Sequence, residues 1–157
     1  MPDSNDDLIR DFYEAFDRRD GDRMAAAYAP DAHFSDPVFT DLNGDEPGAM
    51  WRMLTARADD LRVELLEHQA DGDSGSARWK ATYTFTQTGR PVVNDVRATF
   101  RFGGDGLIAE HRDEFGFHRW ARQALGPTGL LLGWTPIVKS ATRKRARASL
   151  GEFMAKS

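Results

Sequence analysis

The 157-residue chain contains no cysteine, which excludes a disulfide framework, a thiol nucleophile and a cysteine-bound metal. No apolar run approaches the ~20 residues that cross a bilayer. Residues 1–7 are acidic and lack the basic start and the apolar stretch of a secretory signal. We therefore expect a cytoplasmic protein without membrane contact.

A strongly positive face is also missing from most of the chain. The net charge is -4, and residues 1–117 carry 13 basic and 24 acidic side chains. Phosphate binding needs an accumulated positive surface, so we expect no nucleic-acid partner. Residues 118–157 carry eight basic side chains and one acidic side chain. The basic run at 143–147 fits the exposed side of a terminal helix, with a small docking patch for anions as the alternative.

Helices are expected first along the chain. Leu8, Phe12 and Phe16 recur every fourth residue, which predicts a helix over residues 4–19. The acidic cap and the proline at Pro47 predict another helix start. Further helices are expected over residues 20–28, 44–58, 120–125 and 135–154.

Strands follow the helices. Between residues 78 and 87, Trp79, Ala81, Tyr83 and Phe85 alternate with polar residues, which predicts a strand with one buried face. Other strands are expected over residues 32–35, 61–68, 92–102 and 107–117. Short glycine-rich turns between the long strands indicate an antiparallel meander. The predicted class is α+β, with a curved antiparallel sheet wrapped around the N-terminal helices.

Four polar side chains stand on faces that otherwise look buried: Asp36, Asn94, His111 and Asp113. Burying an unpaired carboxylate costs several kcal/mol, so such a group is paired, hydrated or useful. A sheet curled into a cone would leave a pocket where these groups converge, and an apolar pocket with a few polar groups typically binds a ligand.

Each of these side chains also has a purely structural interpretation. Asp36 before Pro37 can close an Asx-type turn. His111 and Asp113 lie two residues apart on one strand and can simply pair with each other. Asn94 can be a buried hydrogen-bonding group.

No motif for a metal or a cofactor is present. The four histidines lack metal-ligand spacing, and there is no dinucleotide fingerprint or phosphate loop. We therefore predict neither a metal nor a cofactor. The histidines are His33, His68, His111 and His118.

The order of elements resembles the nuclear transport factor 2-like superfamily, in its SnoaL-like branch of polyketide cyclases, ketosteroid isomerases and limonene epoxide hydrolases. The resemblance covers about residues 5–125 and rests on short segments in a fixed order. They are FYEAF (12–16), FSDP (34–37), TGR (88–90), FRF (100–102) and HRD (111–113). It implies a conical pocket for a small hydrophobic, oxygenated molecule and a homodimer.

The resemblance also implies catalytic roles. Asp36 matches the aspartate base of the isomerases, and Asp113 matches the base of the cyclases, with His111 as its partner. The isomerases place two oxyanion donors where this chain has Phe12 and Ala98, so that set is incomplete.

The set of the epoxide hydrolases is incomplete as well. Their last-strand aspartate matches Asp113, but their partner arginine and aspartate correspond to Trp79 and Ala81 in this chain. Acid–base catalysis of an isomerase, cyclase or hydrolase type and non-catalytic binding or scaffolding therefore both stay open. The expected ligand-binding residues are Phe12, Tyr28, Phe34, Trp51, Trp79, Tyr83, Asn94 and Phe115.

The chain is expected to divide into a cone domain, residues 1–125, and a tail, residues 126–157. The tail would consist of an apolar loop at 130–134 and the basic helix, packed on the domain or across a dimer. Insertion of the loop at a membrane surface is the alternative.

Overall fold

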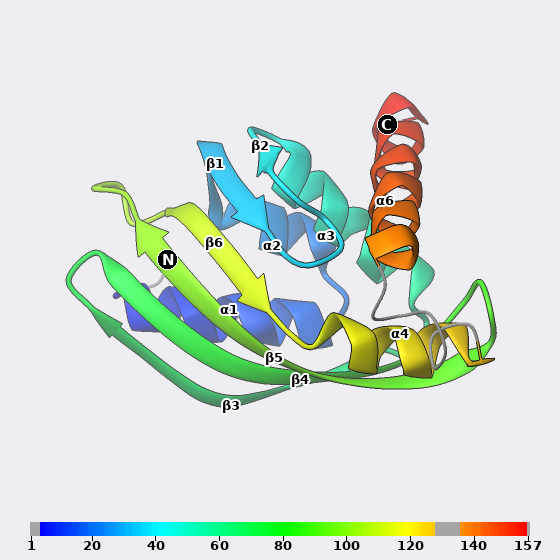
Figure 1. Ribbon diagram of the computed structural model, residues 1–157. Coiled ribbons are helices and arrows are strands. Elements are labelled where there is room, and N and C mark those ends of the chain that lie inside the picture. The colour runs from blue at the N-terminus through cyan, green and yellow to red at the C-terminus, as the bar shows by residue number, and fades with distance from the viewer. Residues whose placement is uncertain (1–3, 128–135, 157) are drawn as a thin grey trace.

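The computed structural model describes residues 4–127 and 136–156, so the predicted apolar loop at 130–134 lies outside the described residues (Figure 1). The helices are α1 (Asn5–Asp17), α2 (Gly21–Ala26), α3 (Glu46–Arg57), α4 (Phe117–Leu125) and α6 (Pro136–Lys156). The strands are β1 (Tyr28–Ser35), β2 (Leu42–Asn43), β3 (Arg62–Asp71), β4 (Ser74–Phe85), β5 (Arg90–Phe102) and β6 (Ile108–Glu114).

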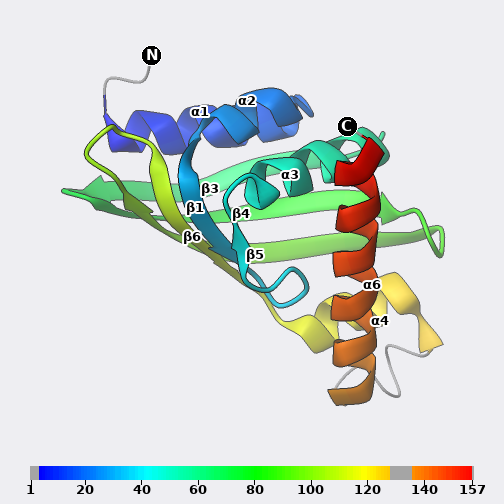
Figure 2. The ribbon, with the colours of Figure 1, turned by 90° about the horizontal axis from the view of Figure 1, so that it is seen from above.

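The strands form one curved sheet in the order β2-β1-β6-β5-β4-β3. Helices α1, α2 and α3 lie along one side of the sheet, and α6 stands across its end (Figure 2). The predicted α+β class and curved sheet are confirmed. The meander β3-β4-β5-β6 is antiparallel as expected, whereas β1 joins β6 in parallel, with Phe34 opposite His111. The sheet is thus mixed, and its parallel pair brings the end of β1 beside β6.

Helix α1 has the apolar stripe that the sequence predicts. The Ser4 hydroxyl caps the helix by accepting a hydrogen bond from the Asp7 amide at 3.1 Å. Leu8, Phe12 and Phe16 are buried. The stripe contributes to the core. A helix of this length is only marginally stable in isolation, so its packing on the core supplies most of its stability.

Helices α2 and α3 pack unusually closely. A Cβ atom at Gly48 would lie only 2.8 Å from the Cβ atom of Ala25, and one at Gly21 would lie 2.7 Å from the Cα atom of Arg52. Both positions therefore require glycine. This contact fixes α3, which carries Trp51, beside the sheet.

Three predicted boundaries are wrong by several residues. In the meander, β3 continues to Asp71 and β4 begins at Ser74, whereas the sequence predicts an end at residue 68 and a start at residue 78. Helix α2 ends at Ala26, and β1 already begins at Tyr28, although Pro30 favours neither a helix nor a regular ladder. The register shifts between Tyr28 and His33, so Pro30 lies in the irregular part of the strand, where a missing N–H is tolerated. At the other end, β6 stops at Glu114 and α4 begins at Phe117.

Helix α6 leaves most of its surface exposed, and Leu150 is its one buried residue. Arginine side chains attach the helix to the body of the protein. Arg143 Nε donates to the Pro37 carbonyl at 2.9 Å, and Arg147 Nη1 lies 2.8 Å from Glu46 Oε2. Within residues 4–127 and 136–156, no helix has the length and apolar character needed to cross a bilayer.

Candidate functional site

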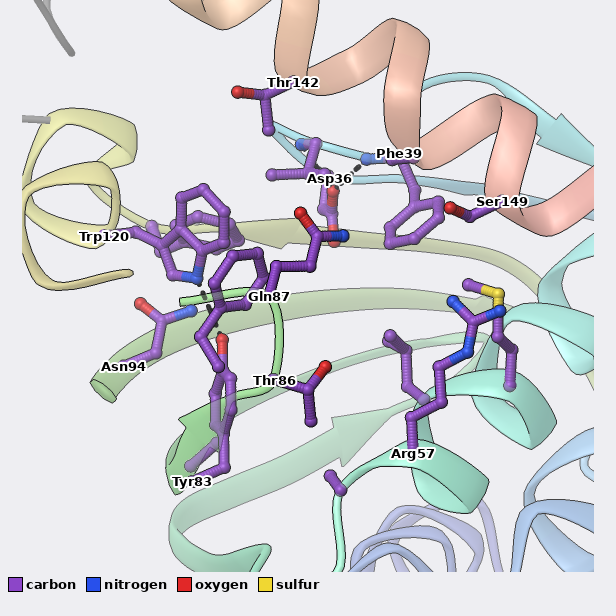
Figure 3. A pocket seen from close by; sticks show the side chains of 18 of the residues that line it. Asp36, Phe39, Arg57, Tyr83, Thr86, Gln87, Asn94, Trp120, Thr142 and Ser149 are labelled. Atoms are coloured by element: carbon purple, nitrogen blue, oxygen red, sulfur yellow. Dashed lines mark hydrogen bonds between the residues drawn. The ribbon is translucent and has the colours of Figure 1, made fainter. Parts of the chain in front are cut away.

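A cavity of about 630 Å³ lies between the sheet, α3, α4 and α6 (Figure 3). Its wall is mainly aromatic and aliphatic. Trp79, Ala81 and Tyr83 come from β4, whereas Val96 comes from β5. The charged side chains of the lining are Asp36, Arg57, Asp113 and Arg145. The cavity thus has the size and the largely apolar wall of sites that bind small molecules.

Asp36 reaches the cavity from the turn that follows β1. Its Oδ1 atom accepts hydrogen bonds from the Val38 amide at 2.7 Å and the Phe39 amide at 2.6 Å. Its own amide donates to the Phe39 carbonyl at 2.8 Å. The Asx-type turn is therefore present, and the same side chain also lines the cavity.

The surroundings of Asp36 make its carboxyl group hard to ionise. The pKa of Asp36 is raised from 3.8 to about 7, and burial is the largest cause. The charge of Asp113 also acts to raise this pKa, while the Phe39 and Val38 amides and the Arg143 guanidinium act to lower it. Asp36 therefore changes its charge near neutral pH.

Asp113 belongs to a buried chain of hydrogen bonds. Its Oδ1 atom lies 2.8 Å from His111 Nε2, and His111 Nδ1 lies 2.7 Å from the Tyr28 hydroxyl. The Trp51 indole N–H donates to the same hydroxyl oxygen at 2.7 Å. Burial raises the pKa of Tyr28 well above its usual value, so this hydroxyl keeps its proton.

The donors and acceptors of this chain determine its direction. Because Trp51 donates to the Tyr28 oxygen, the Tyr28 proton can point to His111 Nδ1, and His111 Nε2–H then donates to Asp113. A neutral His111 with its proton on Nε2 satisfies every group in the chain. Each member fixes the orientation of the next, ending at the Asp113 carboxylate in the cavity wall.

The structure separates the residues that the sequence singles out into two groups. Those that line the cavity are Asp36, Trp51, Trp79, Tyr83, Asn94, Asp113 and Phe115. Phe12, Tyr28, Phe34 and His111 pack behind the wall instead. The His111 ring centroid lies 4.9 Å from that of Phe34 and 5.8 Å from that of Phe12. These four residues support the cavity wall and are not part of the lining.

Tyr83 has a polar environment that the sequence did not reveal. Its hydroxyl oxygen accepts a hydrogen bond from the Trp120 indole N–H at 2.9 Å (Figure 3). Burial raises the pKa of Tyr83, and the nearby Asp36 charge raises it further. No acceptor for the Tyr83 proton occurs among the described residues, so a neutral hydroxyl is free to donate to a ligand.

The sequence analysis did not identify Trp120 or the residues of α6 as part of the site. On α6, Val138, Ala141, Thr142 and Ser149 line the cavity, with spacings of three, one and seven residues. This spacing is typical of one helical face and could have indicated which side of α6 faces the cavity. The pattern was hard to recognise because charged residues interrupt the apolar stripe of α6.

Tyr13 is next to Phe12 on α1, but its hydroxyl is not a substitute for the oxyanion donor expected at Phe12. The Tyr13 hydroxyl and the Trp79 indole nitrogen are buried and have no hydrogen-bond partner among the described residues. Burial raises the pKa of Tyr13, and the Asp113 charge raises it further. Tyr13 does not belong to the cavity lining, so its neutral hydroxyl is shielded from the cavity.

Two other histidines form surface pairs. His33 Nε2 lies 2.8 Å from Asp41 Oδ1, and His68 Nδ1 lies 2.7 Å from Asp6 Oδ1. In the part of the chain that the structure describes, no group of three or more histidine or acidic side chains is arranged to hold a metal ion.

Solved structures with a similar fold are known. An NTF2-like protein of unknown function from Burkholderia pseudomallei is 22% identical, with a TM-score of 0.65, over 76% of this chain and 95% of that one. A hypothetical protein with a ketosteroid isomerase-like fold from Catenulispora acidiphila, in complex with trimethylamine, is 17% identical. Its TM-score is 0.66, over 82% of this chain and 97% of that one.

The family is shown by a separate comparison. None of the curated proteins matches the chain. The model of the SnoaL-like domain matches residues 9–111, which include Asp36 and His111 and end two residues before Asp113. This match covers most of the chain and agrees with the fold of the solved structures. The chain belongs to the SnoaL-like domain family.

Proposed function

We propose that the cavity binds a small hydrophobic, oxygenated molecule and that Asp36 and Asp113 transfer a proton on it. One observation carries this proposal. Carboxylates from two distant parts of the chain, the end of β1 and the last strand β6, line one largely apolar cavity. An apolar wall would orient a hydrophobic molecule and exclude water, while the carboxylates would act on its polar part.

The two carboxyl groups suit different tasks. Asp36 has a pKa of about 7, so it can both accept and release a proton near neutrality. Asp113 is held by His111 at 2.8 Å and is suited to act on a substrate in a fixed orientation. His111, Tyr28 and Trp51 are positioning residues in this proposal, because they act through Asp113.

Tyr83 would supply the hydrogen bond to the substrate oxygen. When a carboxylate removes a proton from the carbon next to a carbonyl group, the electron pair moves onto the carbonyl oxygen and gives an enolate. The free proton of the Tyr83 hydroxyl would stabilise this charge. The protonated carboxyl group then returns the proton to carbon, so the carboxylate is regenerated.

Proton exchange on a simple ketone tests the proposal. We would incubate the protein with 2-tetralone in D₂O and follow loss of the signal of the hydrogens next to the carbonyl by NMR. Exchange should be accelerated above pH 7, and Asp36→Asn should slow it at least tenfold. Asp41→Asn is the matched control, since Asp41 is exposed and outside the cavity.

Non-catalytic binding is the second candidate function. The Catenulispora neighbour holds trimethylamine, and aromatic walls with nearby carboxylates suit small organic cations as well. The absence of the expected donors at Phe12 and Ala98 also favours this candidate. Binding of 2-tetralone by the wild-type protein, measured by tryptophan fluorescence, with no acceleration of exchange would support binding alone. Absence of binding would contradict the proposed function in both forms.

We also propose that the protein forms a homodimer. The family resemblance supports a homodimer, which multi-angle light scattering would test. We also propose a cytoplasmic location, because a chain without cysteine fits a reducing compartment.

A further inference from the structure

The charged residues of the cavity are divided between its wall and its open end. Asp113 is buried and Asp36 is half-buried, whereas Arg57 and Arg145 are exposed. Exposed lining residues mark where the cavity meets solvent, and they include Thr86 and Gln87 of the turn after β4 together with these two arginines. The open end of the cavity is therefore basic, although the lining carries equal numbers of acidic and basic side chains.

The Arg57 side chain has no hydrogen bond or ion pair with any described residue. By contrast, Arg52 on the same helix binds Asp22, with Nε 2.8 Å from Oδ1. The dipole of α3 favours a cation in its last turn but does not require it to line a cavity. Figure 3 shows the Arg57 side chain extending from α3 toward α6, on the side of the cavity where Ser149 lies.

Arg145 differs from its neighbours on α6 in the same way. Arg143 and Arg147 bind the Pro37 carbonyl and Glu46, and so attach the helix. Within residues 4–127 and 136–156, the Arg145 side chain makes one polar contact, from Nη1 to the neutral Gln87 side-chain oxygen at 3.3 Å. It is also the one charged residue of α6 in the cavity lining. Its charge is therefore not compensated by a described acidic group.

Among the described residues, no acidic side chain forms an ion pair with Arg57 or Arg145. The charged groups that shift the pKa of Asp36 are Asp113 and Arg143, and neither Arg57 nor Arg145 is among them. Asp60, beside the cavity, binds the Thr84 hydroxyl at 2.6 Å and the Thr84 amide at 3.1 Å. Two guanidinium groups, from α3 and α6, thus line one cavity at exposed positions and have no anionic partner among the described residues.

We propose that Arg57 and Arg145 form a subsite for the carboxylate of an amphipathic ligand whose apolar body occupies the cavity. The inference rests on the proposed function, because it requires that the cavity binds a hydrophobic molecule. Guanidinium groups bind carboxylates with charge-assisted hydrogen bonds. The ligand class is therefore a hydrophobic carboxylic acid, with the acid group at the open end and its remaining polar group near Asp36, Asp113 and Tyr83.

Three probes with the same alkyl chain and different head groups test this subsite: decanoate, decan-1-ol and decyltrimethylammonium. We would measure their dissociation constants by isothermal titration calorimetry at pH 8 in low salt. Decanoate should bind about tenfold more tightly than decan-1-ol. Arg57→Gln and Arg145→Gln should each reduce this preference about threefold, and the double variant should abolish it. Added salt should also reduce it.

Arg52→Gln is the matched control, because Arg52 lies on the same helix outside the cavity lining. It should leave the preference for decanoate unchanged, and decan-1-ol should bind all variants equally well. Equal binding of decanoate and decan-1-ol, tighter binding of the ammonium probe, or an equal loss of preference in Arg52→Gln would overturn the subsite alone. If none of the three probes binds, the proposed function fails and the subsite fails with it.

Discussion

His111 Nε2 lies 2.8 Å from Asp113 Oδ1, and the two side chains are 0% and 2% exposed. They point the same way because they are two residues apart on β6. In the neighbouring strand β5, Ala98 is opposite Asp113 and Phe100 is opposite His111. The small Ala98 and the aromatic Phe100, whose ring centroid is 4.3 Å from that of His111, leave the pair no other polar partner on β5.

Removing His111 should therefore destabilise the fold strongly. His111→Ala leaves a buried carboxylate without its partner, and we expect a loss of about 3–5 kcal/mol in the free energy of unfolding. The double variant His111→Ala/Asp113→Leu should lose less than the sum of the single variants, by about 1–3 kcal/mol. Urea denaturation measures both quantities. Additive losses would contradict the pairing.

The hydroxyl groups of Tyr28 and Tyr83 should have different roles. Tyr28→Phe removes a group that bridges Trp51 and His111, so the unfolding free energy should fall by about 1–3 kcal/mol. Tyr83→Phe should cost less stability, because its hydroxyl lines the cavity, but should weaken 2-tetralone binding about fivefold. Thermal unfolding and fluorescence titration compare the two variants. Equal effects on stability and binding would contradict the distinction.

Asp36 should make stability depend on pH. The pKa of Asp36 is about 7 in the folded protein, compared with the ordinary value of 3.8 expected in the unfolded chain. The unfolded chain therefore loses the proton first as pH rises. The wild-type protein should therefore lose stability relative to Asp36→Asn between about pH 4 and pH 7, with a constant difference above that. One pKa unit corresponds to about 1.4 kcal/mol, and solvent screening reduces the total to about 2 kcal/mol.

Urea denaturation of both proteins at pH 4, 5.5, 7 and 8 measures this difference. Asp36→Asn is the suitable comparison because the amide oxygen can still accept the Val38 and Phe39 N–H groups. A wild-type protein that gains stability over the variant across this range would show that the pKa of Asp36 is not raised.

Leu150 should anchor α6. It is 1% exposed, and it belongs to the main core cluster. Leu150→Ala should reduce the unfolding free energy by about 2–4 kcal/mol, or should release α6 locally. Hydrogen exchange measured by mass spectrometry separates these outcomes. The matched control Ala148→Gln changes an exposed position of the same helix to another good helix former and should change local exchange only slightly. Unchanged stability and exchange in Leu150→Ala would contradict the anchoring role.

Local patterns explain why most of the fold was predictable. The repeat of Leu8, Phe12 and Phe16 at every fourth residue predicts α1, and the alternation of apolar and polar residues around Trp79 predicts β4. Each pattern reflects one buried face. The boundary between α2 and β1 was predicted wrongly because of Pro30. A proline usually ends regular structure, but it is tolerated in an irregular strand. The parallel pairing of β1 with β6 depends on contacts between distant parts of the chain and has no local signal.

The candidate site was only partly predictable for a similar reason. Asp36 and Asp113 were recognisable as charges within apolar patterns, and both line the cavity. Whether His111 lined the cavity or lay behind its wall could not be decided from strand alternation, which gives His111 and Asp113 the same face. Arg57 was not singled out, and Arg145 belonged to a basic run for which an exposed helix face and an anion-docking patch both stayed open, because the sequence does not show how α6 crosses the end of the sheet.

The pKa of Asp36 tests the account most directly, because its value depends on burial in the cavity and on the Asp113 charge together. The carboxyl ¹³C signal of Asp36 should be followed by NMR against pH in the wild-type protein and in Asp113→Asn. We predict a pKa of about 7 in the wild-type protein and a lower value in the variant. Titration near 3.8 in both proteins would show that the two carboxyl groups do not share one cavity.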